Sequence, residues 1–177
     1  MPIEKSIVVV EGSKITSVGK EGEMALPKEK GVKVIIAEGK TVMPGLIDSH
    51  VHIYTDKECW KDRVNNFKML LEKGIKISLG SDADVPYIRQ GDNARELSIF
   101  VELGMSPMDA IIAATRTAAE AIGVADRVGT IEKGKIADII LIEGCPLDNI
   151  DLLHDEDKIR MVMKEGKIII SKRLMTE

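Results

Sequence analysis

The sequence lacks the features that mark several large classes of protein. Its two cysteines, Cys59 and Cys145, lie far apart and form no CxxC pair, which argues against a zinc ribbon or a disulfide scaffold. No apolar run approaches the roughly 20 residues that span a bilayer, and the first residues do not resemble a secretory signal. Glycine-rich loops of the phosphate-binding type are also absent. We therefore expect a cytoplasmic protein with no membrane partner.

Charge of either sign is present but nowhere concentrated. The chain of 177 residues carries 25 basic and 29 acidic side chains, for a net charge of -4. No basic stripe or block is available to neutralise phosphates, so we expect no nucleic-acid partner. Apolar residues make up 44% of the chain, which excludes a disordered protein because that much apolar surface can form a core.

Both ends of the sequence have the pattern of short β-strands separated by glycine turns. Residues 6–19 and 32–45 each show two β-branched runs around a turn, in the order of a hairpin. The stretch from Lys133 onward has the same character. Because the alternating apolar residues of both ends need a common core, we expect residues 1–43 and 126–177 to form one composite β-sandwich domain.

The middle segment, residues 44–125, has a different pattern of predicted strands and helices. It opens with LIDSHVHI, residues 46–53, whose β-branched alternation predicts a strand. The period of two would direct Asp48 and both histidines to one face, and Ile47 with the later apolar residues to the other. Such a strand suggests that its polar face lines a cavity and that helices cover its apolar face from outside. A second, short buried strand is predicted over residues 75–80.

Helical spacing of apolar residues and glycine stops predict three helices in this middle segment. The third has a clear start signal. Ser106 supplies an N-cap, Pro107 takes the first helical position, and Asp109 gives the acidic third residue of a near capping box. The predicted helices cover residues 61–73, 92–103 and 107–122.

Three residues of the middle segment could hold a metal. His50 and His52 form an HxH pair whose imidazoles would project the same way from a strand and reach one ion. Asp82 follows the second predicted strand, where a carboxylate could bind metal and transfer a proton. The alternatives are two surface or packing histidines, and an Asx turn or helix N-cap at Asp82. His154 lies in an acidic loop, where a solvated histidine is a simpler interpretation than a third ligand.

Four segments resemble, in order, landmark segments of the amidohydrolase superfamily, in particular of its imidazolonepropionase and Xaa-Pro dipeptidase-like members. They are VMPGLIDSHVHIY, LGSDADVP, RELSIFVELGMSPMDAIIAATRTAAEAIGV and VGTIEKGKIADIILIEGCPLDNI. The resemblance implies a metal-dependent hydrolase with a (β/α)8 barrel beside a β-sandwich made from both chain ends. It also implies that His50, His52 and Asp82 are metal ligands and that Asp82 is the catalytic proton shuttle.

The chain departs from that family in length. A (β/α)8 barrel needs about 200 residues at least, so segment 44–125 can hold only a truncated remnant of one. The resemblance places the gap between Ile53 and Lys61, where six strands, a bridging lysine and two histidines of the family have no counterpart. We therefore expect a mixed α/β fold, in which the composite β-sandwich accompanies a barrel remnant with an incomplete metal site.

Two classes of function remain open, and the sequence does not decide whether the chain is an enzyme. By resemblance it is a hydrolase that uses zinc or another divalent metal on C–N bonds of a small amide, cyclic amide or dipeptide-like substrate, and that is weak or inactive in this short form. The alternative is a non-catalytic degenerate member, without metal, that serves as an oligomerisation or assembly module.

In either case we expect a homodimer or a higher homo-oligomer. The predicted strand remnant leaves unpaired edges, and the helices would expose apolar residues such as Leu70, Leu71 and Phe100. Exchange of strand 75–80 between subunits would also avoid a left-handed crossover, since about 98% of such crossovers are right-handed.

Overall fold

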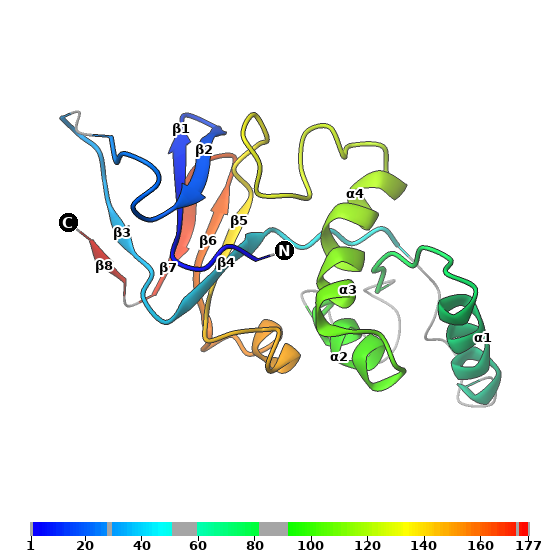
Figure 1. Ribbon diagram of the computed structural model, residues 1–177. Coiled ribbons are helices and arrows are strands. Elements are labelled where there is room, and N and C mark those ends of the chain that lie inside the picture. Colours follow the sequence, from blue (N-terminus) through cyan, green and yellow to red (C-terminus); the bar gives the residue numbers. More distant parts are fainter. Residues whose placement is uncertain (1, 28–29, 51–59, 82–91, 173, 177) are drawn as a thin grey trace.

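The computed structural model describes a β-rich part beside a helical part. The described residues are 2–27, 30–50, 60–81, 92–172 and 174–176. The strands are β1 (Ser6–Glu11), β2 (Lys14–Lys20), β3 (Ile35–Ile36), β4 (Lys40–Pro44), β5 (Ile139–Glu143), β6 (Ile159–Lys164), β7 (Lys167–Ser171) and β8 (Met175–Thr176). The helices are α1 (Trp60–Glu72), α2 (Arg95–Glu102), α3 (Pro107–Ile112), the π-helix η1 (Ala113–Thr117), α4 (Ala118–Ala121) and the 3-10 helix η2 (Ile150–Leu153). Figure 1 shows the chain passing from the sheet to the helices just after β4.

Two antiparallel hairpins form where the sequence predicts strand, glycine turn and strand. β1 pairs with β2 around Gly12, and β6 pairs with β7 around Glu165 and Gly166. Both residues of the second turn have positive φ, 51° and 76°. Two positive φ angles match the twist of the flanking strands, which is why glycine is favoured in two-residue hairpin turns.

The hairpin predicted over residues 32–45 is wrong. β3 pairs with β8, and β4 pairs with β5, so the two strands of this segment join different sheets. The reason is the length of the available partner, since β5 matches all five residues of β4 whereas β3 has only two. The mixed α/β class with antiparallel sheets agrees with the sequence-based prediction.

Pairing of β4 with β5 joins both ends of the chain in one four-stranded sheet, in the order β4-β5-β6-β7. Ile139 and Leu141 of β5 pack with Ile15 of β2 in one hydrophobic cluster. Ile142 belongs to a second cluster, which includes Phe100 of α2. Because neighbouring strand residues point to opposite faces, β5 lies between the hairpin β1–β2 and the helices. The composite sandwich and its predicted limits stay a prediction.

Helix α3 begins as the sequence predicts. Ser106 Oγ accepts the backbone N–H of Asp109 at 3.1 Å and donates to Asp109 Oδ2 at 2.6 Å, and Pro107 is the first helical residue. The predicted third helix continues through η1 and α4, and it ends before Gly123, whose φ is 74°. The N-cap and the glycine stop therefore both act where the local sequence indicates.

Helices α1 and α2 meet through two aromatic rings. The ring centroids of Phe67 and Phe100 are 5.1 Å apart, with planes inclined by 33°. Phe100 is only 1% exposed, and Leu71 packs against the same cluster. The expectation that Phe100 lies on an exposed helix face is therefore wrong, because α1 covers it.

The strands predicted over residues 46–53 and 75–80 are absent from the parts of them that the structure describes. The two segments nevertheless lie side by side, and a backbone hydrogen bond of 3.0 Å joins Ser49 N–H to the Leu79 carbonyl. Since they meet within one chain, the expected exchange of strand 75–80 between subunits has no basis in the structure.

The π-helix η1 accepts backbone hydrogen bonds from both segments. Ile47 N–H donates to the Ala114 carbonyl at 2.8 Å, and Leu79 N–H donates to the Ala113 carbonyl at 3.1 Å. Both carbonyls belong to η1, a kind of helical turn that is rare and often found at functional sites. Buried backbone donors need acceptors, and here the carbonyls of η1 serve as acceptors for both segments.

Candidate functional site

Of the three predicted metal ligands, His50 is within the described residues, whereas His52 and Asp82 lie outside them. His50 is exposed, and its φ is 60°. This left-handed conformation is uncommon for a residue with a Cβ and is not that of a strand. The prediction that alternation along a strand aligns the histidines is therefore wrong at His50.

A hydrogen-bonded turn at Asp48 places His50 in this conformation. Asp48 Oδ1 accepts the backbone N–H of His50 at 3.0 Å, which forms an Asx turn. The same carboxylate reaches across to Ser81, whose N–H lies 3.1 Å from Oδ1 and 3.3 Å from Oδ2, and whose hydroxyl donates to Oδ2. Ser81 is 2% exposed, whereas Asp48 and His50 are exposed, so only the Ser81 end of this network is shielded from water.

The carboxyl group of Asp48 is held in its ionised form. Burial acts to raise its pKa, but the hydrogen bonds from the Ser81 hydroxyl and from the His50 and Ser81 backbones outweigh burial and lower it. Donors that bind the charged form of an acid always act in this direction. Asp48 is thus a fixed negative charge between the two segments.

Serine hydroxyls add further contacts between the same segments. Ser49 Oγ donates to the Leu79 carbonyl at 2.6 Å and lies 2.9 Å from Ser78 Oγ. The backbone N–H of Ser49 also donates to the Leu79 carbonyl. These contacts hold residues 48–50 against residues 78–81 without any contribution from Asp48.

Glu96 is a second acid of the site, in the first turn of α2. It is only 6% exposed, and its Oε2 has no hydrogen-bond partner among the described residues. Burial, together with the negative charge of Asp48, raises the pKa of Glu96 to about 7. The site therefore combines an ionised acid with one that is largely protonated below neutral pH.

Neither Glu96 nor Ser81 is found by the sequence reasoning. A signal for Glu96 exists, because it precedes Phe100 by four positions and so lies on the apolar face of its helix. A charged residue on such a face is unusual and indicates a buried acid. For Ser81 the sequence holds no comparable signal, since its role depends on contact with a segment 33 positions away.

The described residues do not by themselves make a metal centre. Among them, no group of three or more histidine, cysteine, aspartate or glutamate side chains is placed to hold an ion. His154, predicted to be a loop histidine, pairs locally with Asp151, with 3.4 Å between Nε2 and Oδ1. A structural or hydrolytic zinc site normally needs three or four protein ligands, so a complete centre here would require His52 and Asp82 in addition to His50.

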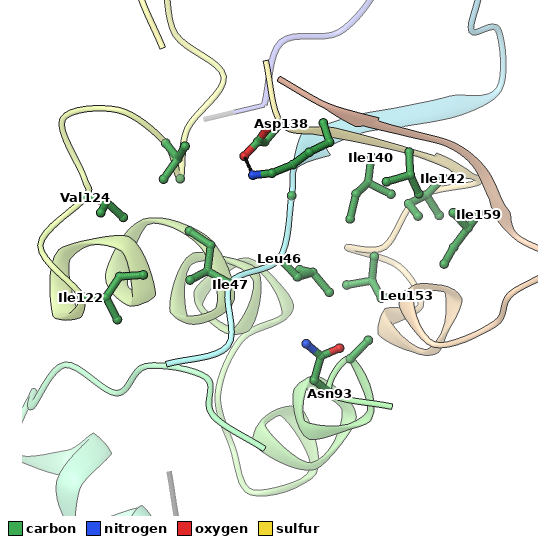
Figure 2. Close-up of a pocket in the computed structure, with 16 residues that line it drawn as sticks. Leu46, Ile47, Asn93, Ile122, Val124, Asp138, Ile140, Ile142, Leu153 and Ile159 are labelled. Carbon is green, nitrogen blue, oxygen red and sulfur yellow. Dashed lines mark hydrogen bonds and ion pairs between the residues drawn. The ribbon is translucent and has the colours of Figure 1, made fainter. Parts of the chain in front are cut away.

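An apolar cavity of about 570 Å³ lies between the sheet and the helices, separate from this site. In Figure 2, Leu46 and Ile47 lie on one side of it, and Ile140 and Ile142 of β5 lie on another. Asp138 and Lys164, which form an ion pair of 2.5 Å, also line the cavity. The residues that line the cavity include none of Asp48, His50, Ser81 and Glu96.

Comparison with known proteins establishes the family. The model of the Amidohydrolase family matches residues 60–169, which is more than half of the chain. The chain therefore belongs to the Amidohydrolase family, as its resemblance to the superfamily predicts. Among the helices that the structure describes, none is long and apolar enough to cross a membrane.

Individual relatives are similar over part of their length. The imidazolonepropionase of Thermoanaerobacter pseudethanolicus is 33% identical over 122 residues, which are 68% of this chain and 27% of the relative. The ochratoxinase of Aspergillus niger is 30% identical over 136 residues, 76% of this chain and 25% of the relative. The crystal structure of an Xaa-Pro dipeptidase with bound methionine matches with a TM-score of 0.58 and 35% identity, over 63% of this chain and 26% of that one. The chain thus spans about a quarter of the length of the curated relatives it matches.

Proposed function

We propose that this chain is a metal-dependent hydrolase of C–N bonds in a small amide, cyclic amide or dipeptide-like substrate. Family membership supports a hydrolase, and the solved relatives include an Xaa-Pro dipeptidase and a phenylurea hydrolase. The observation that carries the proposal for this chain is the contact between two distant segments. His50 and Ser81, the residue before Asp82, both donate backbone hydrogen bonds to Asp48.

In this proposal His50, His52 and Asp82 hold zinc or another divalent metal, and Asp82 moves the proton. The bound metal would supply Lewis-acid polarisation of the substrate carbonyl. The turn at Asp48 holds the backbone of His50 and keeps a fixed negative charge, that of Asp48, next to it. We expect weak or absent turnover in this short chain, because the family's further ligands have no counterpart in the sequence.

A second candidate function is a non-catalytic assembly module that lacks metal. One feature of the sequence favours it: between Ile53 and Lys61, the strands and further ligands that the resemblance implies have no counterpart. A homodimer or higher homo-oligomer is part of both proposals. Exposed apolar side chains support it, namely those of Met69, Ile75, Ile122, Ile169 and Ile170.

Zinc titration of the purified chain separates the two functions. We expect close to one zinc per chain in the wild type and loss of binding in His50→Ala, with His154→Ala as a matched control because His154 pairs only locally with Asp151 in the described structure. An absence of zinc binding supports the assembly module instead. A panel of Xaa-Pro dipeptides and N-acyl amino acids then tests turnover, and rapid zinc-dependent hydrolysis that His50→Ala abolishes would contradict the expected weakness.

A further inference from the structure

Asp48 contacts both segments that lead to the proposed ligands. Its Oδ1 accepts the N–H of His50 at 3.0 Å and the N–H of Ser81 at 3.1 Å, and its Oδ2 accepts the Ser81 hydroxyl. His50 is itself a proposed ligand, and Ser81 directly precedes another, Asp82. One carboxylate therefore fixes the backbone of two segments that are 33 positions apart in the sequence.

We propose that Asp48 is the positioning residue of the candidate site, which sets the separation of His50 from the backbone at Ser81. The inference rests on the proposed function, because it concerns the same site. Hydrogen bonds to an ionised acceptor are shorter and about twice as strong as neutral ones, so a carboxylate is well suited to this task. Both oxygens of Asp48 accept from protein donors, and this supports a positioning role.

The contact does not depend on Asp48 alone, which makes the proposal testable in a folded protein. Ser49 bonds to the Leu79 carbonyl through both its N–H, at 3.0 Å, and its hydroxyl, at 2.6 Å. Leu79 N–H is in turn held by the Ala113 carbonyl. A change at Asp48 should therefore leave the segments packed and alter only the local geometry at His50 and Ser81.

Amide hydrogen exchange of an Asp48→Asn variant is the first test. The amide keeps an oxygen that can accept both backbone N–H groups, but it removes the charge that strengthens those bonds and can place a donor opposite the Ser81 hydroxyl. We expect exchange at the His50 and Ser81 amides to become about 10-fold faster or more, and exchange at Leu79 to stay unchanged. Asp138→Asn is the matched control, because the Asp138 carboxylate also accepts a backbone N–H, from Glu165 at 2.8 Å, but in the β-rich part.

Zinc affinity is the second test, because a purely structural bond would not alter it. Loss of groups that orient metal ligands typically weakens binding 10- to 100-fold. We expect the zinc Kd of Asp48→Asn to rise by about 10-fold or more, and that of Asp138→Asn to equal the wild type. Unchanged exchange at His50 and Ser81 would overturn the inference, and so would faster exchange with an unchanged Kd.

Failure of the proposed function gives a different result. A wild-type chain that binds no zinc refutes the metal site, and the exchange rates alone then decide whether Asp48 holds the two segments. Should Asp48→Asn unfold, the Leu79 amide would also lose protection. In that case Ser81→Ala is measured in place of Asp48→Asn. This variant removes only the hydroxyl bond and should accelerate exchange at Ser81 alone. Unchanged exchange at Ser81 in that variant would count against the inference.

Discussion

Glu96 is a carboxyl group on the apolar face of α2, beside the fixed charge of Asp48. Its pKa is raised to about 7 from an ordinary value of 4.5, first by burial and then by that charge. The folded protein therefore holds this proton at a pH where the unfolded chain has released it. By linkage, the free energy of unfolding falls as the pH rises from about 4.5 to about 7, and the loss persists above that range.

We predict that Glu96→Gln makes the chain more stable than the wild type at pH 8 but not at pH 4.5. The glutamine resembles the protonated acid and cannot ionise, so it avoids a cost of about 3 kcal/mol for burying the charge. Urea denaturation at both pH values measures the difference. Glu102→Gln, on the exposed end of the same helix, is the control and should follow the wild-type profile. Parallel pH profiles for wild type and Glu96→Gln would show that Glu96 titrates normally.

Gly129 illustrates a glycine that is needed for close packing as well as for its backbone conformation. Its φ is 91°, and a Cβ placed there would lie 2.8 Å from Ala119 Cβ and 3.0 Å from the Thr115 carbonyl. Gly134 has the same φ, but a Cβ added at that position would have no atom within 4 Å. Comparison of the two sites therefore separates backbone strain from overpacking.

We predict that Gly129→Ala destabilises the chain by about 1–3 kcal/mol more than Gly134→Ala does. Both substitutions place alanine in a strained conformation, but only the first forces a side chain against η1 and α4. Thermal and urea denaturation of the two variants give the comparison. Equal losses of stability would mean that the loop at Gly129 can move away from the helix.

At the scale of elements, local signals predict those structures whose causes are local. The cap at Ser106 and the turn at Gly166 arise from neighbours within a few residues, and both are present where the sequence indicates. The strands predicted at 46–53 and 75–80 required a ladder of other strands. Instead, backbone N–H groups of these two segments donate to the η1 carbonyls of Ala113 and Ala114. No local sequence pattern predicts these bonds.

We predict that Ser106→Ala lowers the free energy of unfolding by about 1 kcal/mol, the usual cost of losing an N-cap. The variant loses the bond from Asp109 N–H to Ser106 Oγ. Ser106→Thr keeps a hydroxyl acceptor and should lose less than half as much. Chemical denaturation of both variants measures the effect, and equal losses would assign the effect to the size of the side chain and not to the cap.

For the whole molecule, the sequence predicts that the chain ends are joined but not how. The shared texture of the two ends indicates a common core, whereas the actual partners, β4 with β5 and β3 with β8, depend on contacts across the chain. The candidate site shows the same division. His50 was identified from its motif, but Asp48, Ser81 and Glu96 matter only because folding brings them together.

The strand β5 links the two parts of the molecule, because its residues belong to both hydrophobic clusters. Leu141 packs with Ile15 and Met161 on the hairpin side, and Ile142 packs with Phe100 on the helical side. Both side chains are 1% exposed or less. A strand shared in this way makes it difficult for one cluster to come apart while the other persists.

We therefore predict that the β-rich and helical parts unfold together in one transition. Leu141→Ala and Ile142→Ala each remove a buried aliphatic side chain, at a cost of about 2–5 kcal/mol. Each should lower the midpoint temperature of a single calorimetric transition by roughly 5–15 °C, although the two changes lie in different clusters. Leu26→Ala, which removes an aliphatic side chain that is 51% exposed, is the control and should shift the transition little. Two transitions, of which each variant lowers only one, would mean that the helical part folds independently of the sheet.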